Sequence, residues 1–367
     1  MQDSIMIYYI GIFLAAIFAG IAQKLGKNSN KKFKVNYIFW IFSMAVFVFI
    51  FGFRESGIGV DDPSYETIFN STALNGVINE FLNTTMEPGY LLLNYIVSIF
   101  TSNFQVMIFI TTLIPVFLYY KALEYESDKI SMFWGVFFLG TILFIYFCGI
   151  TRLFIAASII AYGLRFVMEK KPIKYIIIVL IATSFHYSAI FMIFLLYFAM
   201  GEKENHKRSN IKLFVLIAFI MPIMIFVVSN YIFPNMGDRY SSYTQIKSGT
   251  LSLDAFDKLP FILIAIFFSK DMLKNNKNID KYITIYAMAL IISVYSVFLD
   301  IGRMQWYCMY STCIILPSIL EVLKKVKSQE YAVMYIPCML IYGLLYSYVN
   351  LTASSREMML HYKNILF

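Results

Sequence analysis

Residues 131–168 read SMFWGVFFLGTILFIYFCGITRLFIAASIIAYGLRFVM, and this stretch decides the class of fold. It holds two apolar runs, each close to the roughly 20 residues that a membrane-spanning helix needs. Only Gly149, Ile150 and Thr151 separate the two runs, and Arg152 opens the second. The stretch therefore predicts two membrane helices joined by a tight break.

The composition of the whole chain agrees with this prediction. Of its 367 residues, 60% are hydrophobic and 14% are charged, against roughly half and a quarter in soluble domains. The aromatic content of 18% suits lipid-facing walls and interfacial belts. The net charge of +8 lies in short loops between apolar runs, so it does not indicate nucleic-acid binding. The first apolar run lacks a basic leader and a cleavage site, and we expect it to be a retained helix.

Further apolar runs of similar length follow along the chain. They lie at about 5–23, 37–53, 105–121, 211–233, 258–273, 282–299, 304–322 and 331–350. Two regions are less regular. We expect 88–102 to be re-entrant or interfacial, and 173–200 to form two half-length helices that fold back at His186. The predicted fold is an all-α polytopic membrane protein, one domain over residues 1–367, with about 12 to 14 transmembrane or re-entrant helices.

Lysine and arginine in short connections favour the cytoplasmic side of a membrane. The basic connections are Lys24 to Lys34, Arg165 to Lys174, Lys203 to Lys212, Lys270 to Lys281 and Lys324 to Lys327. The opposite connections are then outer, and they include loops 54–87 and 234–257, the break at Gly149, the His186 region, Asp300 to Arg303 and the tail after Asn350. This pattern predicts a multi-pass protein of the bacterial cytoplasmic membrane whose chemistry-capable residues gather at the outer face.

The first outer loop carries several candidate residues. Glycine and proline turns in it can hold Arg54, Asp61, Asp62 and Glu87 at the mouth of a cavity. A solvated acidic loop is the alternative interpretation. Adjacent carboxylates at 61 and 62 without a third ligand are a weak signal for a cation site.

The four cysteines give no sign of a metal site or a redox motif. They are Cys148, Cys308, Cys313 and Cys338. All of them lie in apolar runs without metal-ligand spacing, so we expect buried thiols.

Two residues stand at membrane depth. Arg152 either extends to the headgroups or faces the bundle interior. His186 needs a partner or water at that depth. It is either satisfied by Ser184 or Ser188, or it is a functional base or donor.

Two more arginines, Arg239 and Arg303, lie at outer helix ends beside acidic residues. An exposed ion pair there is worth less than about 1 kcal/mol. Convergence of Arg152, Arg239 and Arg303 on one cavity would instead form a site for phosphate oxygens, because guanidinium is the preferred fork for them.

At these residues the chain resembles the EpsG-like branch of the Wzy-type polysaccharide polymerases, which make exopolysaccharide, capsule or O-antigen. The segments that carry the resemblance are Arg54…Gly59-x-Asp61…Tyr65, Glu87-Pro88-Gly89-Tyr90, Arg152 before small residues, Phe185-His186-x-Ser188-Ala189 and the Arg303 segment. The resemblance implies a helical bundle like the large integral-membrane glycosyltransferases. It also implies polymerisation of undecaprenyl-diphosphate-linked oligosaccharides at the outer face. A chain-length regulator and a flippase are the implied protein partners, within membrane lipid.

The hypothesis for the mechanism assigns roles to these residues. Arg152, Arg239 and Arg303 hold the diphosphate, and no metal or other cofactor is expected. The acceptor base is Glu87 or His186, with Asp61 as a third choice. Arg54 pairs with Asp61 or Asp62 to hold the outer loop, and that loop also contacts the glycan. Tyr65, Tyr90 and Tyr240 stack on sugar rings or belong to the aromatic belt.

Other classes of protein remain open from the sequence. A flippase or transporter of the same lipid-linked oligosaccharide is the main alternative, although the two halves show no matching hydropathy. A glycan ligase would use the same donor. A membrane O-acyltransferase would need a histidine reachable from the cytoplasm, and a structural scaffold would not need intramembrane polar residues.

Overall fold

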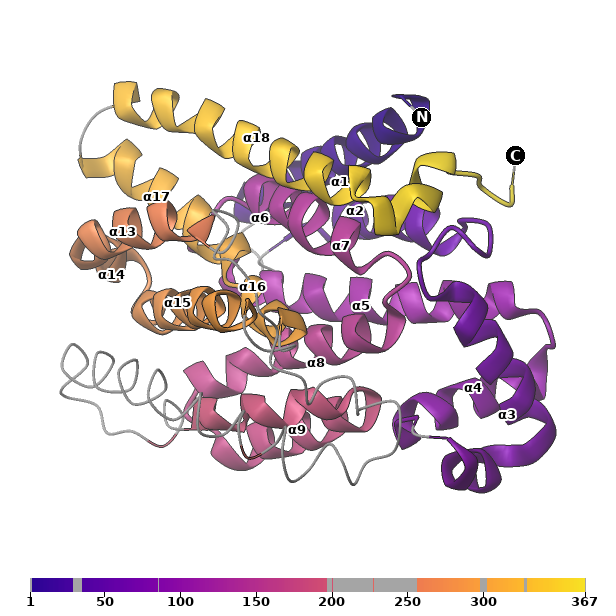
Figure 1. Ribbon diagram of the computed structural model, residues 1–367. Coiled ribbons are helices and arrows are strands. Elements are labelled where there is room, and N and C mark those ends of the chain that lie inside the picture. The colour runs from indigo at the N-terminus through magenta and orange to yellow at the C-terminus, as the bar shows by residue number, and fades with distance from the viewer. Residues whose placement is uncertain are drawn as a thin grey trace.

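The computed structural model describes residues 2–28, 35–84, 86–196, 200, 227, 256–297, 302–326 and 329–366. Within these ranges every regular element is a helix (Figure 1). The extended pairing found there is an isolated bridge between Arg54 and Asn364. The predicted all-α class is therefore confirmed.

The elements of the first half are α1 (Gln2–Asn28), α2 (Tyr37–Phe47), the π-helix η1 (Val48–Gly52), α3 (Asp62–Asn83), α4 (Pro88–Phe100), α5 (Phe104–Glu126), α6 (Met132–Phe138), the π-helix η2 (Leu139–Phe144) and α7 (Ile145–Phe147). Those of the second half are α8 (Thr151–Met168), α9 (Pro172–Phe185), the 3-10 helix η3 (Tyr187–Leu195), α13 (Leu259–Phe267), α14 (Ser269–Asn275), α15 (Ile279–Tyr295), the 3-10 helix η8 (Gly302–Gln305), α16 (Trp306–Met309), α17 (Thr312–Val326), α18 (Gln329–Thr352) and the 3-10 helix η9 (Ser354–His361).

Four of the described helices are long and apolar enough to cross a membrane. They cover Ser4–Gly26, Phe104–Glu126, Thr151–Met168 and Gln329–Thr352. A fifth span is possible if the bent pair Gly302–Met309 and Thr312–Lys325 counts as one, and four shorter apolar helices accompany these. The chain is thus a multi-pass helical membrane protein.

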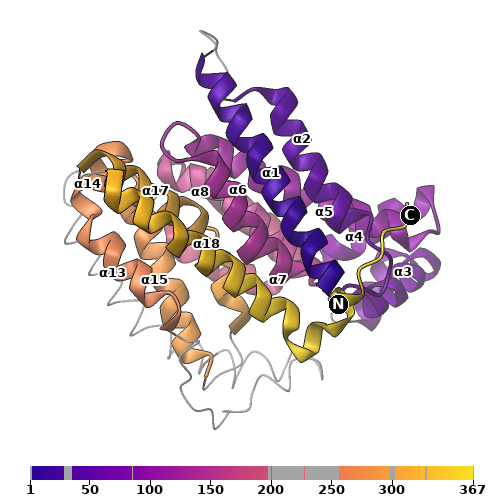
Figure 2. The ribbon, with the colours of Figure 1, turned by 90° about the horizontal axis from the view of Figure 1, so that it is seen from above.

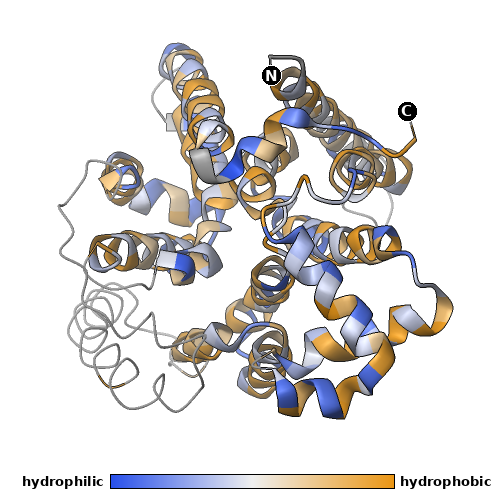
Figure 3. Ribbon diagram, turned by 45° about the vertical axis from the view of Figure 1, so that its right-hand side comes forward, coloured by the Kyte–Doolittle hydropathy of each residue, from blue (hydrophilic) through white to orange (hydrophobic). Residues whose placement is uncertain are grey.

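Helix α8 is central and α18 is peripheral. Of the most apolar window of each helix, 78% is buried in α8 and 28% in α18. Large apolar side chains such as Ile10, Ile38 and Met334 point outward from α1, α2 and α18, and these helices are predominantly hydrophobic in Figure 3. An apolar outer surface of this kind suits contact with lipid.

The break between η2–α7 and α8 falls at Gly149 to Thr151, as the sequence predicts. In contrast, the apolar run predicted over 304–322 is not one straight helix, because the chain bends by 46° between α16 and α17. At the bend, some amides donate to the third preceding residue, as in a 3-10 helix, instead of the fourth. Ser311 N donates to Cys308 O at 3.1 Å, and Ile314 N donates to Ser311 O at 3.1 Å.

The prediction that 88–102 makes no full crossing agrees with its helix, α4. Its 13 residues span only about 20 Å. It packs against α3, which occupies most of the segment 54–87 that was expected to be a loop. Gly76 bends α3 with φ +76°, a left-handed conformation that glycine adopts readily. Residues 234–255 of the second predicted outer loop lie outside the described residues.

The predicted fold-back at His186 is present. Helix α9 ends at Phe185, and η3 then packs back along it. The hydroxyl of Tyr175, near the start of α9, donates to the carbonyl of Met192 in η3 at 2.9 Å. This bond joins residues on both sides of the break, so the two short helices are antiparallel.

The two ends of the chain lie together. Both termini lie at the end that holds α3 and α4, and α14 lies at the opposite end with the α8–α9 turn (Figures 1 and 2). Tyr8 donates to the carbonyl of Met359 at 3.3 Å, which ties α1 to η9. Within the described residues, the predicted outer segment at α3 and α4 and the basic connections at α14 and the α8–α9 turn thus lie at opposite ends of the bundle. Which end faces outward stays a prediction.

Three cysteines, Cys148, Cys308 and Cys313, are buried as expected. The expectation is wrong for Cys338, which is exposed. It lies on α18, a peripheral helix whose outward face is apolar, so hydrophobic neighbours in the sequence do not imply burial in the bundle.

Candidate functional site

Two glycines bring the segment after η1 against the break before α8. A Cβ atom on Gly149 would lie 2.3 Å from the Cα of Gly59, and Gly149 has φ +82°. No other residue type fits such a backbone contact without displacement. The pair therefore positions the Arg54 to Asp62 turn directly beside the start of α8.

Arg54 and Asp62 form a buried ion pair within this turn. Arg54 Nη2 donates to Asp62 Oδ1 at 2.8 Å, and both side chains are at most 5% exposed. The amide of Gly59 donates to the second carboxylate oxygen at 2.9 Å. Burial acts to lower the pKa of Arg54, but the charge of Asp62, the hydrogen bond to it and smaller contributions from neighbouring groups together outweigh burial, so the net pKa lies above its ordinary value. Of the two partners predicted for Arg54, the structure selects Asp62.

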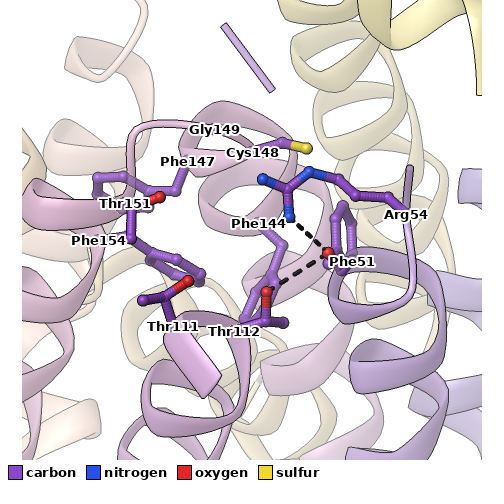
Figure 4. Close-up of a pocket in the computed structure, with 10 residues that line it drawn as sticks. All are labelled: Phe51, Arg54, Thr111, Thr112, Phe144, Phe147, Cys148, Gly149, Thr151 and Phe154. Atoms are coloured by element: carbon purple, nitrogen blue, oxygen red, sulfur yellow. Dashed lines mark hydrogen bonds between the residues drawn. The ribbon is translucent and has the colours of Figure 1, made fainter. Parts of the chain in front are cut away.

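A small cavity lies beside Arg54 (Figure 4). Its volume of about 10 Å³ is close to the least that holds one water molecule. Arg54, Thr111, Thr112 and Thr151 supply its polar lining. Arg54 Nη1 and the hydroxyl of Thr112 both donate to the carbonyl of Phe51, at 2.7 and 3.4 Å. The guanidinium is thus fixed from both sides.

Arg152 and Glu87 form the second buried ion pair. Arg152 Nη1 donates to Glu87 Oε2, and the two side chains are 7% and 1% exposed. Glu87 is the N-cap of α4 and Arg152 lies in the first turn of α8, so the pair joins two helix starts. The amide of Tyr187 contacts Glu87 Oε1 at 3.4 Å, which brings the His186 break to the same place.

Aromatic side chains line this pair. The guanidinium of Arg152 lies 5.7 Å from the ring centre of Tyr65, and its Nε contacts the Tyr65 hydroxyl at 3.5 Å. The ring of Tyr90 lies 5.3 Å from that of Tyr65. Burial raises the pKa of the Tyr65 hydroxyl, although Arg152 acts in the opposite direction. The hydroxyl of Tyr65 also donates to Asp61 Oδ2 at 3.4 Å, which links Asp61 to the cluster.

His186 is half-buried and bonded within its own segment. Its Nδ1 lies 2.8 Å from the hydroxyl of Ser188. That hydroxyl also lies 3.0 Å from the hydroxyl of Tyr307 in α16. Of the two serines proposed as partners, the structure selects Ser188. The sequence did not single out Tyr307, because it lies in an apolar run far along the chain.

Arg303 and Arg356 lie at the same end of the bundle. Arg303, in η8, is exposed, whereas Arg356, in η9, is 7% exposed. Burial lowers the pKa of Arg356. Sequence reasoning did not select Arg356. The available signal was an arginine in the short tail after the last apolar run, a tail that was itself predicted to be outer.

The structure thus brings together most of the predicted site residues: Arg54, Asp61, Asp62, Tyr65, Glu87, Tyr90, Arg152 and the His186 segment. Arg303 lies in η8, directly before Trp306, and Trp306 stacks on Tyr146 of α7. Arg239 and Tyr240 lie outside the described residues. In the part of the chain that is described, no three histidine, cysteine, aspartate or glutamate side chains gather as a metal-ligand group.

The fold and the site define a multi-pass helical membrane protein with two buried arginine–carboxylate pairs at one end of the bundle. The model of the EpsG family matches residues 37–364, and the chain belongs to this family. No curated protein and no solved structure showed a significant match. Membership of this family is in keeping with a role in polysaccharide synthesis.

Proposed function

We propose that this protein polymerises undecaprenyl-diphosphate-linked oligosaccharide repeat units at the outer face of the bacterial cytoplasmic membrane. The growing glycan is transferred from its lipid diphosphate to the sugar of an incoming lipid-linked repeat. The observation that carries the proposal is the buried Arg152–Glu87 pair beside Tyr65 in a chain of the EpsG family.

The donor side of the reaction needs a group that stabilises the departing diphosphate. Arg152 uses Nη1 for Glu87 and Nε for Tyr65. Its remaining donors are available to oxygen atoms of a phosphate, to which a guanidinium binds with charge-assisted hydrogen bonds. Arg303 and Arg239 complete the proposed set. Because arginines supply this charge, we expect no metal requirement.

The acceptor side needs a base. The acceptor hydroxyl loses its proton to the base, its oxygen bonds to the anomeric carbon, and the bond from that carbon to the diphosphate oxygen breaks with the electron pair leaving on the diphosphate. Glu87, His186 and Asp61 are the candidates. Glu87 and His186 are joined through the Glu87–Tyr187 contact, so either lies within the same small region.

The aromatic pair Tyr65 and Tyr90 is proposed to contact the sugars, with Tyr240 as a further candidate. The turn that carries Arg54 and Asp62 holds the wall of the site in place. A flippase and a chain-length regulator are the proposed protein partners, and membrane lipid surrounds the bundle.

The test is reconstitution of the purified protein in lipid with its lipid-diphosphate repeat unit, followed by separation of products on a gel. Wild type should give a ladder, and Arg152→Ala should abolish it. Arg165→Ala is a matched control, because Arg165 lies on the same helix but in its last turn. A ladder in Arg152→Ala would reject the assignment of Arg152. Movement of substrate across the bilayer without a ladder would reject the polymerase in favour of a flippase.

A further inference from the structure

The arginines at this end of the bundle differ in whether a carboxylate neutralises their charge. Arg54 is paired with Asp62 and Arg152 with Glu87, and all four side chains are buried. Arg356 is buried as well, but among the described residues no carboxylate lies within ion-pair distance of it. Its Nη1 donates to the carbonyl of Ile145 at 3.3 Å.

The guanidinium of Arg356 stacks on an aromatic ring. It lies 4.2 Å from the ring centre of Tyr146 in α7. Stacking covers one face of the planar group and leaves its N–H edge available to an acceptor. Of the five N–H donors of an arginine, the carbonyl of Ile145 takes one.

A second arginine approaches the same ring. Tyr146 stacks on Trp306, with ring centres 3.3 Å apart and planes inclined by 18°. Trp306 begins α16 directly after η8, which carries Arg303. Arg356 therefore contacts this pair of rings directly, and Arg303 lies on the short helix that leads into Trp306.

A buried guanidinium without a counter-ion is costly, and such groups are retained where they bind an anion. Planar bidentate donation makes arginine the residue of choice for phosphate oxygens. The compensated Arg152 supplies directed hydrogen bonds but little net charge, whereas Arg356 brings a buried positive charge beside Tyr146.

We propose that Arg356, together with Arg303, binds the phosphate oxygens of a lipid-linked diphosphate beside Tyr146. This inference rests on the proposed function and adds a residue from the C-terminal tail to the site. It also separates two roles, because Arg356 and Arg303 attract the anion while Arg152 orients it.

The test measures binding of farnesyl diphosphate, with farnesol as the uncharged reference, to the full chain in nanodiscs of phosphatidylcholine. Wild type should bind the diphosphate more tightly than farnesol. R356Q should weaken diphosphate binding by about tenfold or more, the loss expected for a charge-assisted bidentate contact. R356K should fall between the two. K363Q is the matched control, since Lys363 lies on the same tail with its side chain 73% exposed, and its binding should equal that of wild type.

Equal diphosphate binding by a folded R356Q and by wild type would overturn the assignment of Arg356 and leave the proposed function standing. No preference of wild type for farnesyl diphosphate over farnesol would overturn both. If R356Q does not fold, R356K decides: weaker binding supports the proposal and unchanged binding overturns it.

A second arm distinguishes the substrate diphosphate from a lipid headgroup. Binding is repeated in nanodiscs that contain phosphatidylglycerol. If Arg356 serves the substrate, anionic headgroups should reduce the affinity of wild type and R356Q by the same factor. A reduction confined to wild type would mean that Arg356 holds a lipid headgroup, and the proposal would be wrong.

Discussion

Replacing Glu87 by glutamine is expected to leave the guanidinium of Arg152 without its counter-charge. The side chains are 1% and 7% exposed, so solvent cannot take over the role of the carboxylate. Removal of one partner of a buried pair costs about 3–5 kcal/mol. The contact from the Tyr187 amide to Oε1 can persist with glutamine, which favours the lower end of that range.

The double variant Glu87→Gln/Arg152→Met isolates the pair. Replacing both charges by groups of similar size removes the uncompensated charge, and stability should return to within about 1 kcal/mol of wild type. With Arg152→Met as the second single variant, and if it is also destabilising, the coupling energy should be about 2 kcal/mol or more. At about 2 °C per kcal/mol, the single variant Glu87→Gln should lower Tm by about 6–10 °C. Circular dichroism of the protein in detergent micelles measures this shift.

A matched control is Glu169→Gln, because Glu169 pairs with Lys171 at the surface, with the side chains 31% and 47% exposed. An exposed pair contributes less than about 1 kcal/mol. If the Glu87 variant loses no more stability than this control, or if the double variant is no more stable than the single one, the reasoning fails. The double variant should still make no polymer, which separates stability from activity.

Three further predictions concern the surrounding residues. Gly149→Ala should unfold or inactivate the protein, because its Cβ would lie 2.3 Å from backbone. Gly57 has φ +93°, but a Cβ atom there would meet nothing within 4 Å, so Gly57→Ala should lower the free energy of unfolding by only about 1–2 kcal/mol. Equal losses of Tm in Gly149→Ala and Gly57→Ala would contradict this. Tyr307→Phe removes the hydrogen bond to Ser188, and Ser188→Ala removes both that bond and the one to His186. Ser188→Ala should therefore slow polymerisation at least as much as Tyr307→Phe in the gel assay, and a larger effect of Tyr307→Phe would be contrary evidence. Polymerisation should survive EDTA, and a loss restored by Mg²⁺ would reject the metal-independent mechanism.

The class of fold follows from the sequence because hydropathy and length are local properties. Breaks at Gly149 and His186 also carry local signals, a glycine and a polar residue within apolar runs. The bend at Tyr310 and Ser311 carries no such local signal, because the apolar run reads as continuous there. Both residues are buried in the structure. Helix α3 was missed, although the sequence Asp62-Pro63 is a usual helix start.

The sequence indicated which residues belong to the candidate site better than which of them form ion pairs. Arg152 and Glu87 each stand out as charged residues beside apolar runs, but 65 residues separate them. No spacing rule joins residues so far apart. Arg356 lies still further along the chain, and its proposed role rests on stacking on Tyr146 and on the absence, among the described residues, of a carboxylate within ion-pair distance. Both are tertiary properties.

Three helices begin at the site, and their starts explain the arrangement of charges. Asp62 lies in the first turn of α3 and Glu87 caps α4. The positive end of a helix dipole stabilises a carboxylate at each of these positions. Arg152 lies in the first turn of α8, where the same dipole opposes its charge, so it needs a carboxylate from another helix.

Glu87 supplies that carboxylate, and the pair therefore fixes the start of α4 against the start of α8. The Gly59–Gly149 contact fixes the turn before α3 against the same point. Apolar residues would join three helices at lower cost than buried charges do. Buried charges are useful here if an anionic group binds at the site. Hydrogen-bond donors of the arginines that are already in position would stabilise a departing diphosphate without having to reorganise.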